Sequence, residues 1–316
     1  MRTRSSHGQA TVLTVVFLVV LLGMAALVLD VGSWYRAKRA AQSTADAAAL
    51  AGAQVLPDTG NASTLANQYA SKNGVLGSGG ISFSSDLNPN DSITVNVKRA
   101  APGFFAKIFG LSSVSVGATA TARIEGVSQV KYVAPITVHY KHPLLNCKGP
   151  SSAPVCDPSF GPGYPTTLDL EDLHQKGGGN GSGAFGLLNL NYGDPDGNIG
   201  AGTLADWLAN GYQDYLPIGK YYSAPSANFN NSQFLSSLDS VKGKEVLFPV
   251  YRLLTGPGSN AQYDIIGWVG FVITSWTANG SNGSVSGYFT RYIADGIGPS
   301  SGGDPDFGVR KVELVN

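Results

Sequence analysis

Cys147 and Cys156 are the only two cysteines of the 316-residue chain, and they flank a short segment rich in proline, glycine and serine. A lone pair at this spacing is typical of a disulfide that closes a loop. Free thiols are one alternative. A zinc site that adds His139 and His142 is another, but Pro143 and the extended pattern around it give no fixed ligand geometry. We therefore expect a disulfide and no metal site.

Three short strings contain residue types found in catalytic or calcium sites. Residues 298–302 match G-x-S-x-G, but that motif needs a strand before the serine and a helix after it, whereas the prolines on both sides predict a loop. Residues 194–198, DPDGN, carry oxygen ligands, but they lack the rest of a calcium-binding loop and are typical of a turn or a weak calcium site. Asp169, Glu171, Asp172 and His174 are typical of a solvated helix start. We expect no enzyme activity and no cofactor.

The composition limits the classes of partner that the protein is expected to bind. The net charge is zero and only 13% of the residues are charged, with no basic patch. Nucleic-acid binding proteins concentrate Lys and Arg on one face or along one segment. We therefore expect no nucleic acid among the partners.

Residues 10–29, ATVLTVVFLVVLLGMAALVL, contain no charge. A helix over this run is roughly 30 Å long, which matches the hydrocarbon core of a bilayer. A cleaved signal peptide and a buried helix of a soluble protein are the alternatives. The run is longer than a signal peptide's apolar core, however, and no charged residue gives it a solvated face. We predict a transmembrane helix at 10–29 after a cytoplasmic tail at 1–9, so that the lipid bilayer is one partner.

Asp30, Trp34 and Tyr35 follow this run directly. A charge costs far less at the membrane interface than at the bilayer centre, and tryptophan and tyrosine are enriched at that interface. We therefore predict that these three residues lie at the membrane interface.

Residues 30–56 contain no proline and are dense in alanine, the strongest helix former. The transmembrane helix is expected to continue through them as a stalk until Pro57 ends it. Small residues recur along the stalk at steps of four, three and four: Ala41, Ala45, Ala48 and Gly52. This alanine stripe permits close approach of another backbone, either in the protein's own globular region, which we favour, or in a partner helix.

The order of residues around the apolar run resembles a known family. It reads Gly8-Gln9-Ala10, the run itself, Leu29-Asp30-Val31-Gly32, Tyr35, and then RAAQSTADAAALAGA at 39–53. It is similar to the N-terminal region of the TadE/TadG-like proteins of bacterial tight-adherence (Flp) pilus systems, over about residues 8–55. The resemblance implies a membrane-anchored component of pilus assembly, or a pseudopilin-like one, with pilus-assembly or pseudopilin proteins as partners.

One position departs from processed pilins, which usually carry glutamate at the fifth residue after the cleavage site. Counted from Gln9 after Gly8, that position is Leu13, and residues 10–29 contain no glutamate. The resemblance therefore fits the TadG-like members, which keep their anchor, better than the processed ones.

Orientation does not follow from charge, because Arg2 and Arg4 precede the run while Arg36, Lys38 and Arg39 follow it. Long domains translocate largely regardless of charge. The long C-terminal region is poor in lysine and glutamate and rich in glycine, serine, asparagine and tyrosine. We expect a single-pass protein of a bacterial cell membrane with a cytoplasmic N-terminus and an extracytoplasmic C-terminal region.

Alternating apolar and polar residues predict the rest of the α+β fold. Residues 57–127 are expected to form a small pilin-like unit with a hairpin of strands at 81–83 and 93–97, a short helix at 104–109 and a strand at 114–122. The pilin-like layout rests on analogy. Residues 128–316 are expected to form a β-rich domain with mainly antiparallel strands at 133–140, 245–254, 263–276 and 285–293.

The hypothesis that these observations favour is a membrane-anchored structural or assembly component of a Flp-type pilus. It would act through helix packing and an exported β-rich interaction domain. A cell-surface adhesin or glycan-binding module is the alternative, in which exposed aromatic residues contact sugars or the envelope. An anchored hydrolase is less favoured, because the four histidines are scattered along the chain.

Overall fold

The computed structural model describes residues 7–73, 75–86, 89–169, 186–193, 199–224, 229–256, 260–279, 282–298 and 305–315. The chain divides into two compact units. Unit 1 comprises Met1–Ile124 and Val312–Asn316, and unit 2 comprises Glu125–Lys311. The sequence predicted a division near residue 127, but it did not predict that the last residues return to the first unit.

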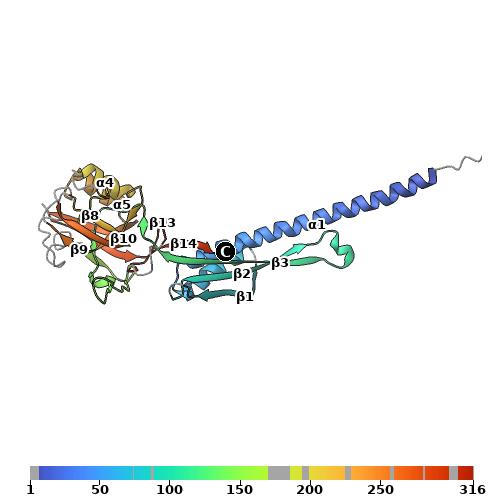
Figure 1. The fold of residues 1–316 in the computed structure, drawn as a ribbon, viewed down its shortest axis with the longest axis horizontal. Coiled ribbons are helices and arrows are strands. Elements are labelled where there is room, and N and C mark those ends of the chain that lie inside the picture. Colours follow the sequence, from blue (N-terminus) through green and yellow to red (C-terminus); the bar gives the residue numbers. More distant parts are fainter. Residues whose placement is uncertain are drawn as a thin grey trace, which may run out of the picture. The chain divides into compact units, whose positions relative to one another are not determined.

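Unit 1 begins with α1, a single 47-residue helix at His7–Ala53 (Figure 1). Its valine-, leucine- and alanine-rich sequence contains no proline, so nothing interrupts the backbone hydrogen bonds. The predicted end at residue 56 is three residues too late. Residues 54–57 form turns, in which Val55 N–H donates to Gly52 O and Leu56 N–H donates to Ala53 O.

Helix α2, Thr59–Asn73, follows at once. The side chain of Asp58 accepts a hydrogen bond of 3.1 Å from the backbone N–H of Asn61, which satisfies one free donor of the first turn. Ala62, Ala66 and Ala70 recur every four residues and are fully buried. This small-residue face lets α2 pack closely against the end of α1.

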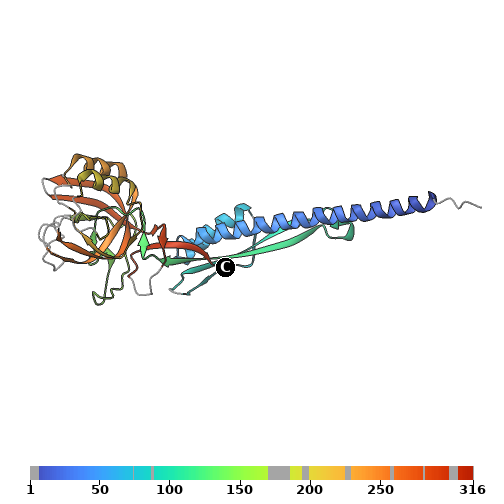
Figure 2. The same ribbon diagram turned by 45° about the horizontal axis from the view of Figure 1, so that its top comes forward.

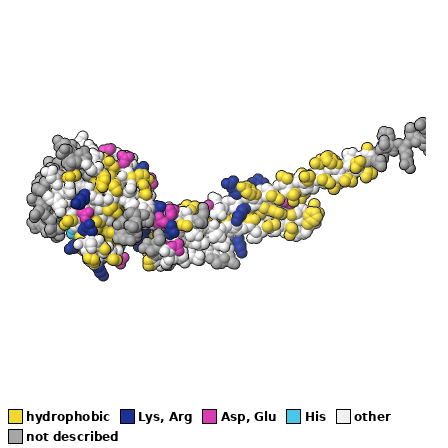
Figure 3. All heavy atoms as spheres, viewed as in Figure 1, with side chains coloured by type: hydrophobic (Ala, Val, Ile, Leu, Met, Phe, Trp, Pro, Cys, Tyr) yellow, Lys and Arg dark blue, Asp and Glu magenta, His cyan; other side chains and the backbone are white. Residues whose placement is uncertain are grey.

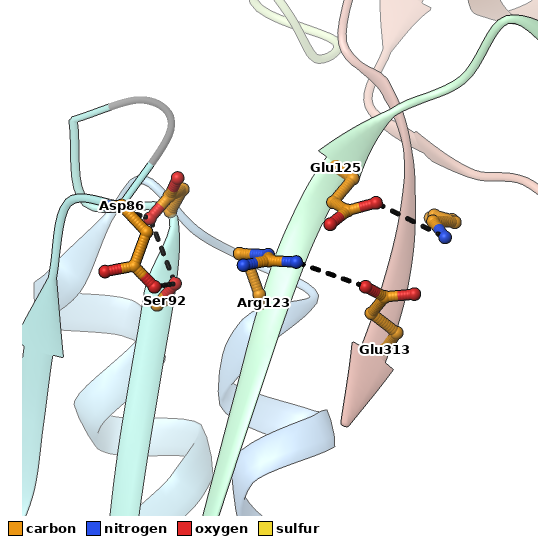
Figure 4. Close-up of polar contacts among 7 residues, drawn as sticks. Asp86, Ser92, Arg123, Glu125 and Glu313 are labelled. Carbon is orange, nitrogen blue, oxygen red and sulfur yellow. Dashed lines mark hydrogen bonds and ion pairs between the residues drawn. The ribbon is translucent and has the colours of Figure 1, made fainter. Parts of the chain in front are cut away.

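The sheet of unit 1 contains β1 (Val75–Ser84), β2 (Ser92–Pro102), β3 (Ser113–Gly126) and β14 (Val309–Val315), in the order β1-β2-β3-β14. The predicted hairpin is confirmed, since Ile81 pairs with Val95 in antiparallel register. The pairing of β2 with β3 is also antiparallel and runs without a shift from Ser92↔Arg123 to Pro102↔Ser113. Next to it, Arg123 of β3 forms an ion pair with Glu313 of β14 (Figure 4).

The short helix predicted at 104–109 is the 3-10 helix η1, Ala106–Phe109, which connects β2 to β3. Gly110 ends it with a φ of 85°, a conformation that glycine adopts without steric cost. Figure 2 shows the β2–β3 hairpin running along α1.

The core of unit 1 lies between the helices and one face of this sheet. Ile93, Val95 and Val97 alternate with half-buried Thr94 and Asn96 along β2, as expected when one face of a strand is covered. The helices contribute mostly alanine, including Ala45 and Ala49. Side chains this small bring the helix backbone close to the sheet.

Unit 2 is built on a six-stranded sheet in the order β5-β9-β10-β11-β6, with β8 paired to β10. Its strands are β5 (Val138–His139), β6 (Thr166–Asp169), β8 (Gly219–Tyr222), β9 (Glu245–Thr255), β10 (Gln262–Asn279) and β11 (Asn282–Thr290). All pairs are antiparallel except β5–β9. The prediction of a mixed α+β fold with largely antiparallel sheets is confirmed.

Smaller elements complete unit 2. They are β4 (Gln129–Val130), η2 (Pro143–Leu145), α4 (Ala201–Asn210), β7 (Leu216–Pro217), α5 (Ser232–Val241), β12 (Tyr292–Ile293) and β13 (Gly296–Ile297). Strands β13, β4 and β7 form a small sheet, and β12 pairs with the first residues of β14. The core is aromatic, with Phe271 in ring contact with both Phe248 and Phe289.

The strand predicted at 133–140 is wrong in extent, since only Val138–His139 form a strand there. Pro135 has no N–H to contribute to a ladder. Isolated bridges at Val133 and Ile136 replace regular pairing. The three long strands predicted near the C-terminus are confirmed, with a register shift between Ile265 and Gly267 on β10.

Candidate functional site

The first half of α1 exposes a continuous apolar surface. Every large hydrophobic side chain from Val12 to Val31 has an exposed fraction between 49% and 69%. In the described part of the chain, α1 is the one helix long and apolar enough to cross a membrane. A surface of this kind is stable in lipid rather than in water, which supports a single-pass anchor.

Asp30 ends this apolar run, and its carboxylate is satisfied by backbone donors rather than by solvent. Its Oδ1 accepts hydrogen bonds from the N–H groups of Phe104 (2.6 Å) and Phe105 (3.2 Å), and its Oδ2 accepts from Phe105 (3.1 Å) and Ala106 (2.6 Å). Asp30 is only 4% exposed. It therefore holds the first turn of η1 against α1, as a capping carboxylate does at a helix start.

Trp34 and Tyr35, the other residues predicted at the membrane interface, differ in exposure. Tyr35 is 60% exposed, and the Arg39 guanidinium lies over its ring at 5.8 Å. Trp34 is half-buried, and its indole Nε1 has no hydrogen-bond partner among the described residues. Their location relative to a bilayer stays a prediction.

The alanine stripe lies inside unit 1. Ala41, Ala45 and Ala48 are fully buried, and a Cβ on Gly52 would be 2.6 Å from Ile93 Cδ1 and 3.1 Å from Ala62 O. Of the two interpretations that the sequence left open, the geometry favours packing on the protein's own α2 and β2. The stripe is covered and is not available to a partner helix.

A second set of contacts ties α1 to the β2–β3 hairpin beyond Asp30. Ser33 Oγ donates to Pro102 O at 3.4 Å, Lys38 Nζ donates to Gly117 O, and Gln42 Nε2 donates to Thr119 O at 3.3 Å. These donors are spread over residues 33–42 of α1, so the helix and the hairpin are held in a fixed register.

The predicted disulfide joins Cys147 and Cys156 in unit 2. Within the loop that it closes, Lys148 and Val155 exchange two backbone hydrogen bonds of 2.8 and 2.9 Å. The bond therefore closes a loop that is already paired. Among the described residues no group of three or more His, Cys, Asp or Glu side chains could hold a metal ion.

His139 and His142 line a different feature, a pocket of about 380 Å³ whose wall also includes Thr166, Asp169 and Tyr251. His142 Nε2 lies 3.1 Å from Thr166 Oγ1. Burial lowers the pKa of His139, a hydrogen bond with the Arg252 backbone opposes this shift, and nearby Lys141 adds to it. A neutral imidazole in this pocket can accept or donate a hydrogen bond without placing a charge in an apolar environment.

Two buried tyrosines are kept protonated here: Tyr251 in the wall of the pocket and Tyr263, which is in ring contact with it. Burial raises the pKa of Tyr251 and raises that of Tyr263 to about 12. The Tyr263 hydroxyl accepts a 3.0 Å hydrogen bond from Gly186 N–H. The Tyr251 hydroxyl has no hydrogen-bond partner among the described residues, although its ring is fully buried.

Other strings that the sequence singled out lie mostly beyond what the structure describes. Residues 299–302 of the G-x-S-x-G string, residues 194–198, and residues 171–174 of the acidic cluster all fall outside the described residues. Asp169 is described, and it ends β6 at the rim of the pocket.

The sequence missed two features that organise unit 1. One is the hydrogen bonding of Asp30 to a loop 74 to 76 residues later, and the other is the return of β14 to β3. For the first, a signal was present: GFFAKIFGL at 103–111 is apolar but was expected only to form a short helix.

Comparison with known families bears on α1. A family model described as "Putative Flp pilus-assembly TadE/G-like" matches residues 8–55. This N-terminal segment is similar to that family. The match covers α1 almost completely and none of the sheets. No curated protein and no solved structure is significantly similar to the chain.

Proposed function

We propose that this chain is a membrane-anchored structural or assembly component of a Flp-type pilus. The match of residues 8–55 to the TadE/G-like family carries the proposal. The matched segment contains both an apolar surface suited to lipid and a packed half that supports a folded unit. An anchor that continues rigidly into a folded unit suits a protein that holds other components near the membrane.

In this proposal the N-terminus is cytoplasmic, and unit 2 and the part of unit 1 that follows the anchor lie on the extracytoplasmic side of the cell membrane. The Cys147–Cys156 disulfide supports this orientation, because disulfides persist in oxidising compartments and are rare in the cytoplasm. The proposed role is structural rather than catalytic.

Because the alanine stripe is covered, a partner would contact the exposed remainder of α1. A hollow of about 400 Å³ next to the β2–β3 hairpin is lined by Lys38, Arg39, Gln42, Ser43 and Asp46, of which Lys38 and Gln42 also donate to the hairpin. Positive, negative and amide side chains together suit a polar contact with a pilus-assembly or pseudopilin protein.

Deletion of the gene in a pilus-forming host, followed by complementation, tests this role. Photo-crosslinking residues at exposed Ser43 and Ala47 of α1, with exposed Thr64 of α2 as the matched control, would identify neighbours of the stalk in intact cells. We expect loss of pili on deletion and crosslinks to pilus components from the two α1 positions only. Normal piliation of the deletion strain would overturn the proposal.

The pocket beside β5 and β6 favours a second candidate function, the binding of a glycan by a surface module. It combines hydrogen-bonding groups of His139, His142, Thr166 and Asp169 with an apolar wall, as small-molecule sites do. Binding of labelled oligosaccharides by the purified full chain, compared with a His142→Ala variant, tests this candidate. Equal binding by both proteins would exclude the pocket as the site.

A further inference from the structure

The turn between β2 and β3 exposes an unusual number of large apolar side chains. In this apolar turn the exposed fractions are 59% for Phe104, 41% for Phe105, 78% for Ile108, 84% for Phe109 and 53% for Leu111. Monomeric soluble proteins rarely expose such a contiguous patch to water. Something other than water therefore covers the turn in the working protein.

The apolar turn is fixed beside α1 at a defined level. The four hydrogen bonds from residues 104–106 to Asp30 hold its first residues next to the end of the apolar run, and Ser33 holds Pro102 one turn further along. Figures 1 and 2 both show the tip of the hairpin alongside α1. The exposed apolar surface of α1 thus continues onto the turn without a gap along the helix axis.

Basic side chains mark the far border of this surface. Lys38 of α1 donates to Gly117 O, and Gly117 is the strand partner of Lys98, so the two lysines lie at the same level. Arg39 and Arg99 follow directly, and all four side chains are exposed. Figure 3 shows Lys and Arg side chains gathered where the hydrophobic surface of this unit ends.

The spacing of these levels fits one leaflet of a bilayer. Lys38 follows Asp30 by eight residues, which is about 12 Å along a helix axis. Amphipathic elements that lie in the interface bury their apolar face about 5–10 Å into the headgroup and acyl boundary. If the basic side chains lie among the headgroups, the turn and Asp30 lie at the boundary between the headgroups and the acyl chains. Lys107, the one charge between Arg99 and Arg123, has a stem long enough to reach back toward the headgroups.

We infer that the β2–β3 turn is a second membrane-contacting element, whose apolar side chains insert into the leaflet from which α1 emerges. Lipid is the occupant, because the turn adjoins a helix surface that lipid itself covers and a belt of cations complements anionic headgroups. This inference requires that α1 spans a membrane, but it does not depend on a role in pilus assembly.

Environment-sensitive probes on the full chain test the inference. The two native cysteines form a disulfide, so Ile108→Cys and, separately, Phe109→Cys can each carry an NBD label. Gln68→Cys on exposed α2 is the matched control. The labelled chains are reconstituted in nanodiscs of phosphatidylcholine and phosphatidylglycerol, with or without spin-labelled acyl chains.

We expect blue-shifted emission from residues 108 and 109, with acyl-chain quenching several-fold stronger than at residue 68. A Phe105→Asp change in the Ile108→Cys chain should weaken this quenching. Water-like emission at both turn positions would overturn the inference. Shielding that disappears when each nanodisc holds one chain would also overturn it, since a second copy would then cover the turn. Shielding that needs an added pilus protein would point to a protein partner instead of lipid.

Discussion

Gly52 of α1 lies directly against Ile93 of β2, so closely that a Cβ on Gly52 would be 2.6 Å from Ile93 Cδ1. The glycine allows the end of α1 to approach both the sheet and α2 at one point. Ala45 and Ala48 continue the same buried face toward the membrane. Unit 1 therefore depends on small side chains along this face more than on large ones.

An enlarged side chain on this face should destabilise unit 1. We expect Ala48→Leu to lower the free energy of unfolding by about 1–3 kcal/mol, because overpacking a close helix–sheet contact forces side chains and backbone to shift. Hydrogen exchange of the β2 amides in detergent-solubilised full chain measures this loss.

Ala47→Leu is the matched control, since Ala47 is exposed one position away on the same helix. Substitutions at such positions change stability by about 0.5 kcal/mol or less. Equal protection of β2 in the two leucine variants would show that the buried face tolerates added volume.

The sequence predicted those features of unit 1 that depend on neighbouring residues. The apolar run, the alanine face and the hairpin that pairs Ile81 with Val95 each follow from a local period of 3.6 or 2 residues. The same reasoning left open what covers the alanine face, because the periodicity of a sequence identifies which side of a helix is buried but not which element packs on it.

Contacts between distant parts of the chain escaped prediction. Arg123 and Glu313 are 190 residues apart, and Asp30 is 74 residues from Phe104. No local pattern encodes either pairing. In unit 2, the pocket around His139 and Tyr251 likewise forms only when β5 pairs with β9. The sequence singled out His139, His142 and Asp169 separately, but not as parts of one site.

Removal of the disulfide should destabilise unit 2. The loop closed by Cys147 and Cys156 spans nine positions, and the chain-entropy relation for a loop of this size gives about 2–3 kcal/mol. We expect the double variant Cys147→Ser, Cys156→Ser to unfold at a lower denaturant concentration than the wild type. Tryptophan fluorescence monitors the unfolding. Three of the four tryptophans, Trp207, Trp268 and Trp276, belong to unit 2. A midpoint equal to that of the wild type would show that the Lys148–Val155 pairing suffices.

The same two cysteines report orientation. In intact cells, a membrane-impermeant maleimide should label the full chain only after treatment with a membrane-impermeant reductant, because an extracytoplasmic disulfide is oxidised and accessible. The double serine variant should remain unlabelled and serves as the control. Labelling that requires lysis but no reductant would assign unit 2 to the cytoplasm and would contradict the pilus and adhesin proposals together.

Acid should weaken unit 2 through His139. Burial holds the pKa of this imidazole below 6.5, and Lys141 lowers it further against the hydrogen bond with the Arg252 backbone. Between the lowered folded pKa and 6.5, the unfolded chain binds more protons than the folded chain. The free energy of unfolding therefore rises with pH in that window and falls on acidification, by at most about 1.4 kcal/mol per pH unit for one proton.

Urea unfolding at about pH 8 and about pH 5 measures this effect, since the two conditions lie on either side of an ordinary imidazole pKa. His139→Gln removes the titrating group and should reduce the difference in midpoint between the two conditions. Lys141→Gln removes one cause of the shift, so it should raise the pKa of His139 and also reduce the difference, while the imidazole and its contact with Tyr251 remain. A pH dependence unchanged in both variants would assign the acid sensitivity to other groups of unit 2.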